Sequence, residues 1–153
     1  MLKRLFWIAA WVMLCSCDGL FSGDQVVRFP LDARPQGGYA PIKLALGPEM
    51  NPIALNFTAE YTVDPSESGK WNSYSAILTR NGQVVGATTF NINNSTTPDA
   101  PVGAPGVAYT MMVLNVGTVA DYELAIGPNA PPRITLKKPA VEVRRNINRP
   151  PAQ

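Results

Sequence analysis

The sequence predicts an all-β protein, a small antiparallel β-sandwich of about seven strands that follows a cleaved signal peptide and a flexible tether. Three observations predict this class. Apolar and polar residues alternate with a period of two over several segments, which is typical of strands with one buried face. An Asn-Gly dipeptide separates two such segments and predicts a hairpin. The 153 residues, 46% of them apolar, suffice for one domain with a core.

The chain begins with the pattern of an export signal. Lys3 and Arg4 precede ten consecutive apolar residues, 5–14. At about 1.5 Å per residue, this run reaches only half of a hydrocarbon core roughly 30 Å thick. A short apolar run behind positive charges predicts a secretory signal rather than a membrane-spanning helix.

Residues 14–17 (LCSC) resemble the lipobox of bacterial lipoproteins, in which a Leu and two small residues precede an obligatory Cys. The resemblance implies cleavage after Ser16, a lipid on Cys17 and an acyl chain such as palmitate on the new amino terminus. Asp18 resembles the sorting residue that retains lipoproteins in the inner membrane of enteric bacteria. We therefore expect the periplasmic side of the cell membrane, with the inner membrane favoured over the outer.

The expected organisation has four parts: a signal peptide at 1–16, a lipidated N-terminus and tether at 17–41, a β-sandwich domain at 42–143 and a basic flexible tail at 144–153. Gly, Pro and Asp are frequent in the tether, as in flexible linkers. An edge strand at 26–29 is an alternative within it. The basic end of the chain would either lie against anionic lipid headgroups or be a solvated segment.

The clearest strand is 53–63, where Ile53, Leu55 and Phe57 would face the core and the residues between them the solvent. Asn81-Gly82 predicts a type I′ turn between strands at 73–80 and 83–92. In that register Arg80 lies opposite Gln83, Leu78 opposite Val85 and Tyr74 opposite Thr89.

Residues 107–116 are apolar on both faces and predict a central strand, with Met111 and Met112 on opposite faces. Residues 121–126 alternate again. The segment 133–143 predicts a last edge strand interrupted by Pro139. The stretch 114–124, a Gly-containing turn before an aromatic-x-Leu strand, is similar to the closing strands of jelly-roll and GOLD-like domains.

Catalytic chemistry finds little support in the sequence. The chain has no His, which excludes a Ser-His-Asp triad, a Cys-His pair and any imidazole metal ligand. We expect no enzymatic activity, no cofactor and no metal. One alternative is an envelope hydrolase in which Asp121 and Glu123, on one face of a strand, act as a glycosidase pair. The other interpretation of this pair is two solvent-facing charges.

We therefore expect a lipid-anchored, non-enzymatic protein that binds a protein partner, or serves as an accessory structural subunit, in an envelope complex. The alternative is a glycan- or peptidoglycan-binding module whose aromatic contacts are Trp71 and Tyr74. For Trp71 a structural role, capping one end of the core, is also open. The expected partners are the membrane, through the lipid on Cys17, and an envelope protein. No other partner is expected. An exported protein rarely meets nucleic acid.

Overall fold

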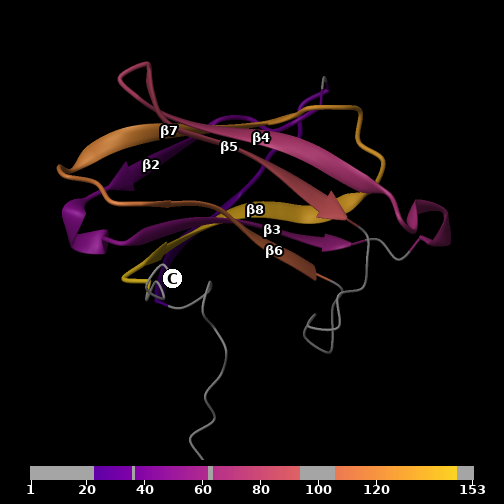
Figure 1. Ribbon diagram of the computed structural model, residues 1–153, viewed down its shortest axis with the longest axis horizontal. Coiled ribbons are helices and arrows are strands. Elements are labelled where there is room, and N and C mark those ends of the chain that lie inside the picture. Colours follow the sequence, from indigo (N-terminus) through magenta and orange to yellow (C-terminus); the bar gives the residue numbers. More distant parts are fainter. Residues whose placement is uncertain (1–22, 36, 62–63, 94–105, 148–153) are drawn as a thin grey trace, which may run out of the picture.

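A computed structural model describes residues 23–35, 37–61, 64–93 and 106–147, and it confirms the predicted all-β class. The strands form two antiparallel four-stranded sheets, which lie as two layers in Figure 1. One sheet has the order β1-β8-β3-β6 and the other β2-β7-β4-β5. The elements are β1 (Asp24–Pro30), β2 (Ile42–Leu46), η1 (Pro48–Met50), β3 (Ile53–Tyr61), η2 (Pro65–Glu67), β4 (Trp71–Arg80), β5 (Gln83–Asn93), β6 (Gly106–Leu114), β7 (Ala120–Pro128) and β8 (Leu136–Arg145).

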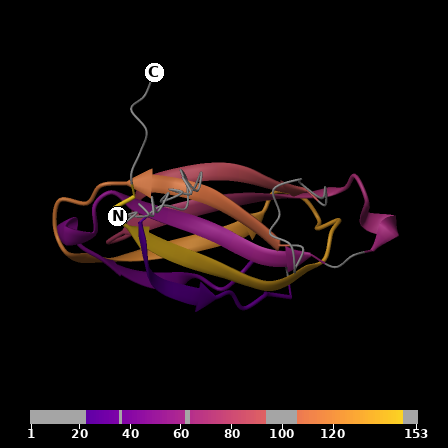
Figure 2. The same ribbon diagram turned by 90° about the horizontal axis from the view of Figure 1, so that it is seen from below.

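The strand order is that of a jelly roll. The first strand pairs with the last, β2 with β7, β3 with β6 and β4 with β5. This is the pattern of one long antiparallel ribbon rolled into two packed sheets. β1 consequently lies along the edge beside β8 (Figure 2).

The expected tether is part of the fold from Asp24 onward. Most of β1 pairs with β8, as the alternative of an edge strand at 26–29 predicted. Beyond it, Leu31 and Tyr39 are buried in the core. The prediction of a flexible tether is therefore wrong for the described residues up to 41, because this segment supplies apolar side chains to the core. The predicted signal peptide, Cys17 and Asp18 lie outside the described residues.

The prediction that a flexible tail begins at residue 144 is also wrong. β8 runs through residues 144 and 145, and Ile147 is buried. The Arg144 guanidinium donates to Glu142 Oε1 at 2.6 Å and to the Gly23 carbonyl at 2.8 Å. Residues 144–147 are thus part of the sandwich, because their contacts close the end of the sheet where β1 begins.

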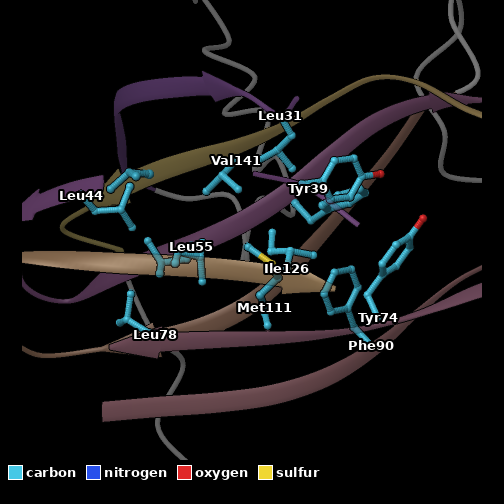
Figure 3. Close-up of a cluster of buried hydrophobic side chains, with 14 of the residues drawn as sticks. Leu31, Tyr39, Leu44, Leu55, Tyr74, Leu78, Phe90, Met111, Ile126 and Val141 are labelled. Carbon is cyan, nitrogen blue, oxygen red and sulfur yellow. The ribbon is translucent and has the colours of Figure 1, made fainter. Parts of the chain in front are cut away.

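The core lies between the two sheets (Figure 3). Ile53, Leu55 and Phe57 of β3 are completely buried, which confirms the alternation predicted for this strand. Ala54 and Asn56 are buried as well, although we expected them to face solvent. β3 is an inner strand, and the side chains of its cross-strand neighbours on β6 and β8 flank both residues. These neighbours are Val113 and Arg144 for Ala54, and Thr110 and Glu142 for Asn56.

Four aromatic rings form a cluster within this core. Their centroids are 5.4–6.1 Å apart, a spacing at which aromatic rings attract one another. Two come from the sheet of β4 and β5, one from β3 and one from the segment before β2. The four are Tyr39, Phe57, Tyr74 and Phe90.

The hairpin between β4 and β5 is confirmed, but its register beyond the turn is shifted. Asn81 and Gly82 have φ values of 50° and 75°, as a type I′ turn requires. Arg80 pairs with Gln83 as predicted, but a bulge follows, and Leu78 then pairs with Gly86 instead of Val85. The extra residue moves every later pair by one position, so that Phe90 rather than Thr89 faces the core opposite Tyr74.

Two predictions of strand position are wrong. β6 is an edge strand, not a central one. A bulge explains why the strand seemed apolar on both faces. Met112 pairs with Leu55 and Thr110 with Asn56, which leaves Met111 as the extra residue. Met111 is buried, and both methionines line the same groove instead of facing opposite sides.

The last strand, β8, is an inner strand rather than an edge. Pro139 is tolerated there because the pairing with β3 is irregular at this point. Lys138, just before it, has φ +47°, as in many bulges. The Pro139 carbonyl still accepts a hydrogen bond from the Leu31 N–H at 2.9 Å.

Candidate functional site

The first residue of β4 exposes a large aromatic ring. Trp71 is 49% exposed, so the interpretation that it caps the core is wrong. The Arg133 guanidinium, from the loop between β7 and β8, lies over the indole at 6.0 Å from its centroid. Trp71, Ser73 and residues 130–133 together line a hollow of about 370 Å³. We call these residues the Trp71 ledge.

A buried amide fixes this ledge to the fold. Asn72, 3% exposed, points inward between the sheets, whereas its neighbour Trp71 points outward. Its Oδ1 accepts from the Arg133 N–H at 2.6 Å and from the Ile134 N–H at 3.0 Å. Its Nδ2 donates to the Ile134 carbonyl at 2.9 Å and to the Tyr74 hydroxyl at 3.0 Å. All four hydrogen bonds of the amide are therefore made.

Further polar contacts hold the loop from the outer face of the sheet. The Asn129 backbone N–H donates to the Ser73 carbonyl at 2.9 Å. Its side-chain amide donates to Ser73 Oγ at 3.1 Å, and its Oδ1 accepts from Ser75 Oγ at 2.6 Å. Two prolines, residues 131 and 132, follow in the same loop and restrict its backbone. The ledge is thus a fixed surface.

The second predicted aromatic contact does not belong to this surface. Tyr74 is 3% exposed and packs against Phe57 and Phe90 in the core. The structure therefore does not bring Tyr74 together with Trp71 on one binding face. Its hydroxyl instead accepts from Asn72, so that Tyr74 supports the ledge from beneath.

Sequence reasoning missed Asn72 and Arg133. The signal for Asn72 was an amide at an inward-facing position between two aromatic residues of a strand. Arg133 follows two prolines and is far from Trp71 in sequence, so no local pattern connects the two.

The ledge and the first described residue lie at opposite ends of the sandwich. At one end, Arg144 contacts Gly23, and the Ile147 N–H donates to the Pro52 carbonyl just before β3. β3 then runs to the far end, where the Tyr61 hydroxyl donates to the Asn93 carbonyl at 2.7 Å, and Asn93 pairs with Trp71. η1 and η2 mark the two ends in Figure 1.

The two carboxylates considered for hydrolysis are both exposed. Asp121 and Glu123 lie on the outer face of β7, with Ala45 and Lys43 of β2 opposite them. The hollow beside them is a shallow one of about 250 Å³. A buried pair in a pocket, on which the hydrolase hypothesis depends, is therefore not formed by these residues.

A second candidate site is a groove along the open side of the sandwich. Its volume is about 510 Å³, and it lies between β5 and β6, the edge strands of the two sheets. Residues 85–88 line one wall and residues 111–114 the other, with Arg80 and Tyr122 in contact at one end. We call this the edge groove.

The strands that flank the edge groove carry no charge. β5 and β6 contain no Lys, Arg, Asp, Glu or Pro, whereas β1 carries Asp24, Arg28 and Pro30 and β2 carries Lys43. No other described strand pairs with the outer side of β5 or β6. Charged residues and prolines protect sheet edges from pairing with other chains, so these two edges lack the usual protection.

Within the described residues, no group of three or more His, Cys, Asp or Glu side chains is placed to hold a metal ion. Residues 64–68 form a turn around η2, where Asp64 accepts from the Ser66 N–H at 2.8 Å.

No helix in the described part of the chain is long and apolar enough to cross a membrane. No protein-family model, curated protein or solved structure matches this chain.

Proposed function

We propose that this chain is a lipid-anchored lipoprotein of the bacterial cell envelope and acts as a non-enzymatic protein-binding or accessory structural subunit of an envelope complex. The export signal and the lipobox at 14–17 support the anchoring. Lipid on Cys17 would hold the chain on the periplasmic side of the cell membrane, with Asp18 favouring the inner membrane. The proposal involves no cofactor, metal or nucleic acid.

The edge groove is the observation that carries the protein-binding role. Its two flanking strands offer unpaired backbone N–H and C=O groups, and an extended segment of a partner would add a strand to either edge. Met111 and Met112 give the groove thioether side chains, which adapt to partner surfaces of different shape. Val85, which lines the groove, is 53% exposed, and its neighbour Val84, 63% exposed, extends the apolar surface beyond it.

The position of the groove also favours a partner in the membrane. Its β6 wall ends at Leu114, which pairs with Ile53 at the end of the sandwich where Gly23 lies. Only residues 18–22 separate Gly23 from Cys17. A lipid on Cys17 would therefore keep the groove close to the bilayer, within reach of a membrane-embedded subunit.

Anchoring is tested by mass spectrometry of the mature amino terminus from cells that express the full chain. We expect a lipid-modified Cys17 as first residue, loss of the lipid in Cys17→Ser and normal processing in the control Cys15→Ser. A chain that begins at Met1, or an unmodified Cys17, would contradict the proposal.

Partner binding is tested by photocrosslinking in the same cells. A photoreactive residue at Val84 should form an adduct with one envelope protein at native abundance. The same residue at Lys43, on the opposite edge of that sheet, serves as the matched control. Equal adducts at both positions, or none at Val84, would argue against the edge groove as a docking site.

A glycan- or peptidoglycan-binding module is the second candidate function. The exposure of Trp71 favours it, because a flat ring held in a fixed position is suited to stacking on a sugar. The ledge lies at the end of the sandwich away from Gly23, so it would face away from an anchoring bilayer. Binding of sugars to the ledge and of protein to the edge groove would use separate surfaces.

A further inference from the structure

We propose that the Trp71 ledge binds an acidic sugar, with the sugar ring on the exposed indole of Trp71 and the sugar carboxylate on the guanidinium of Arg133. This inference rests on the second candidate function and specifies its ligand class. Three observations support it: the positive charge of Arg133, the lack of an acidic partner for that charge among the described residues, and the hydrogen bonds that hold the ledge in place.

Arg133 provides a cation whose side chain has no acidic partner among the described residues. Its guanidinium contacts the Trp71 ring, and its backbone N–H is the group that bonds to Asn72. By contrast, Lys138 pairs with Glu60 and Arg145 with Asp24. Glu67 is engaged elsewhere, since its carboxylate accepts from the Thr135 N–H and hydroxyl at 2.9 and 2.7 Å.

A guanidinium in this position suits a carboxylate ligand. Its planar set of N–H donors matches the two carboxylate oxygens, and its contact with the indole, 6.0 Å from the ring centroid, places it beside the hollow before a ligand arrives. The residues that line the hollow include no Asp or Glu. An anion would therefore meet no like charge from the walls of the hollow.

The neutral parts of the ledge suit the rest of a sugar. The exposed part of the Trp71 indole offers a flat apolar surface of the kind on which sugar C–H groups stack. Ser73 lines the same hollow and offers a hydroxyl, which is held by the Asn129 amide. The flat face of the indole and the hydroxyl of Ser73 thus lie in one hollow, as the apolar and polar groups of a small-ligand site do.

The ledge is built before any ligand binds. Three hydrogen bonds from Asn72 to residues 133 and 134, together with the two prolines at 131–132, fix the loop that carries Arg133. A ligand would therefore lose little binding energy to ordering the protein. The inferred site thus combines a stacking surface, a cation with no acidic partner in the described part of the chain and a rigid support.

Binding is measured on the full chain, purified from membranes in detergent, by tryptophan fluorescence. Trp71 is the only Trp after residue 17, so its emission reports on the ledge directly once the signal is removed. The probes are hexagalacturonate, its methyl ester and the peptidoglycan disaccharide of N-acetylglucosamine and N-acetylmuramic acid. The ester keeps the sugar rings and removes the charge, and the disaccharide tests peptidoglycan as the source of the carboxylate.

We expect at least one acidic probe to change the emission and to bind at least about tenfold more tightly than the methyl ester, the scale of one charge-assisted contact. Arg133→Gln should remove this preference by weakening binding of the acid to the level of the ester, with a much smaller effect on the ester itself. Trp71→Ala, titrated by calorimetry, should abolish binding of acid and ester alike. The matched control is Arg34→Gln, an exposed Arg outside the ledge, which should change neither affinity.

Each outcome decides between the proposals. Equal binding of acid and ester would overturn the acidic-sugar inference and leave the glycan-binding function standing. No binding of any probe at millimolar concentration would overturn both. Arg133→Gln should leave the melting temperature unchanged because its side chain is exposed, whereas Trp71→Ala removes a half-buried ring outside the core cluster and should lower the melting temperature by only a few degrees. A full loss of binding in a Trp71→Ala protein that still unfolds cooperatively therefore locates the ligand at the ledge.

Discussion

The side chain of Asn72 pairs with the backbone of Ile134 as a second strand would. It accepts from the Ile134 N–H at 3.0 Å and donates to the Ile134 carbonyl at 2.9 Å. No described strand spans Ile134, so the amide replaces the ladder partner that the buried backbone of this loop needs. One side chain from β4 thereby joins the loop between β7 and β8 to the sheet.

Replacing Asn72 by Ala should therefore destabilise the protein by about 3 kcal/mol, because buried backbone groups of residues 133 and 134 lose their partners. The free energy of unfolding in urea measures the change. Asn91→Ala, on the exposed outer face of β5, is the matched control and should change stability by less than about 0.5 kcal/mol. Similar small effects for the two variants would contradict this role of Asn72.

Local patterns predicted the fold class and several strands but not the arrangement of the sheets. The alternation in β3 and β7 is a property of consecutive residues, and the core positions of Leu55 and Leu124 follow from it. The Asn81-Gly82 turn is equally local, because its two residues adopt the positive φ that they favour. What could not be predicted depends on residues that are distant in sequence.

Bulges account for much of the difference. One extra residue near Val85 moved the register of the β4–β5 hairpin, and one at Met111 gave an edge strand the apolar pattern of a central strand. Neither bulge has a sequence signal of its own. Trp71 was predicted as a candidate contact, but the edge groove and the contact of Arg133 with Trp71 were missed because each joins residues that are distant in sequence.

Phe57→Ala should cost about 3 to 5 kcal/mol of stability, since its ring is fully buried between Tyr39, Tyr74 and Phe90. The loss combines buried apolar area with the cavity left in the aromatic cluster. Thr58→Ala, the next residue on β3 and only partly buried, is the control and should cost far less. Urea unfolding of the two variants gives the comparison, and equal losses would show that the aromatic cluster is not the centre of the core.

The stability of the protein should fall at alkaline pH, in part because of Tyr39. Burial, and then the neighbouring Tyr74, raise the pKa of Tyr39 well above its ordinary value of 10.0. A raised pKa in the folded state means that the stabilisation is complete below pH 10 and is lost as pH rises above it, where the unfolded chain ionises first. Tyr39→Phe should reduce the loss of stability between about pH 8 and about pH 11. A loss as steep as in the wild type would contradict this assignment.

A positive charge on the β5 edge should prevent partner binding without affecting the fold. Val85 is 53% exposed and lies at the bulge beside the edge groove, so Val85→Lys should change the unfolding free energy by less than about 0.5 kcal/mol. A lysine there would oppose the approach of another strand, as charged residues do on the protected edges of natural sheets. The adduct formed from a photoreactive residue at position 84 should therefore fall to background. Val119→Lys is the control, because it adds the same charge at a residue that is 72% exposed and does not line the groove. This variant should leave the adduct intact. If both lysines reduced the adduct equally, a general effect of charge would explain the result, and strand addition at β5 would be rejected.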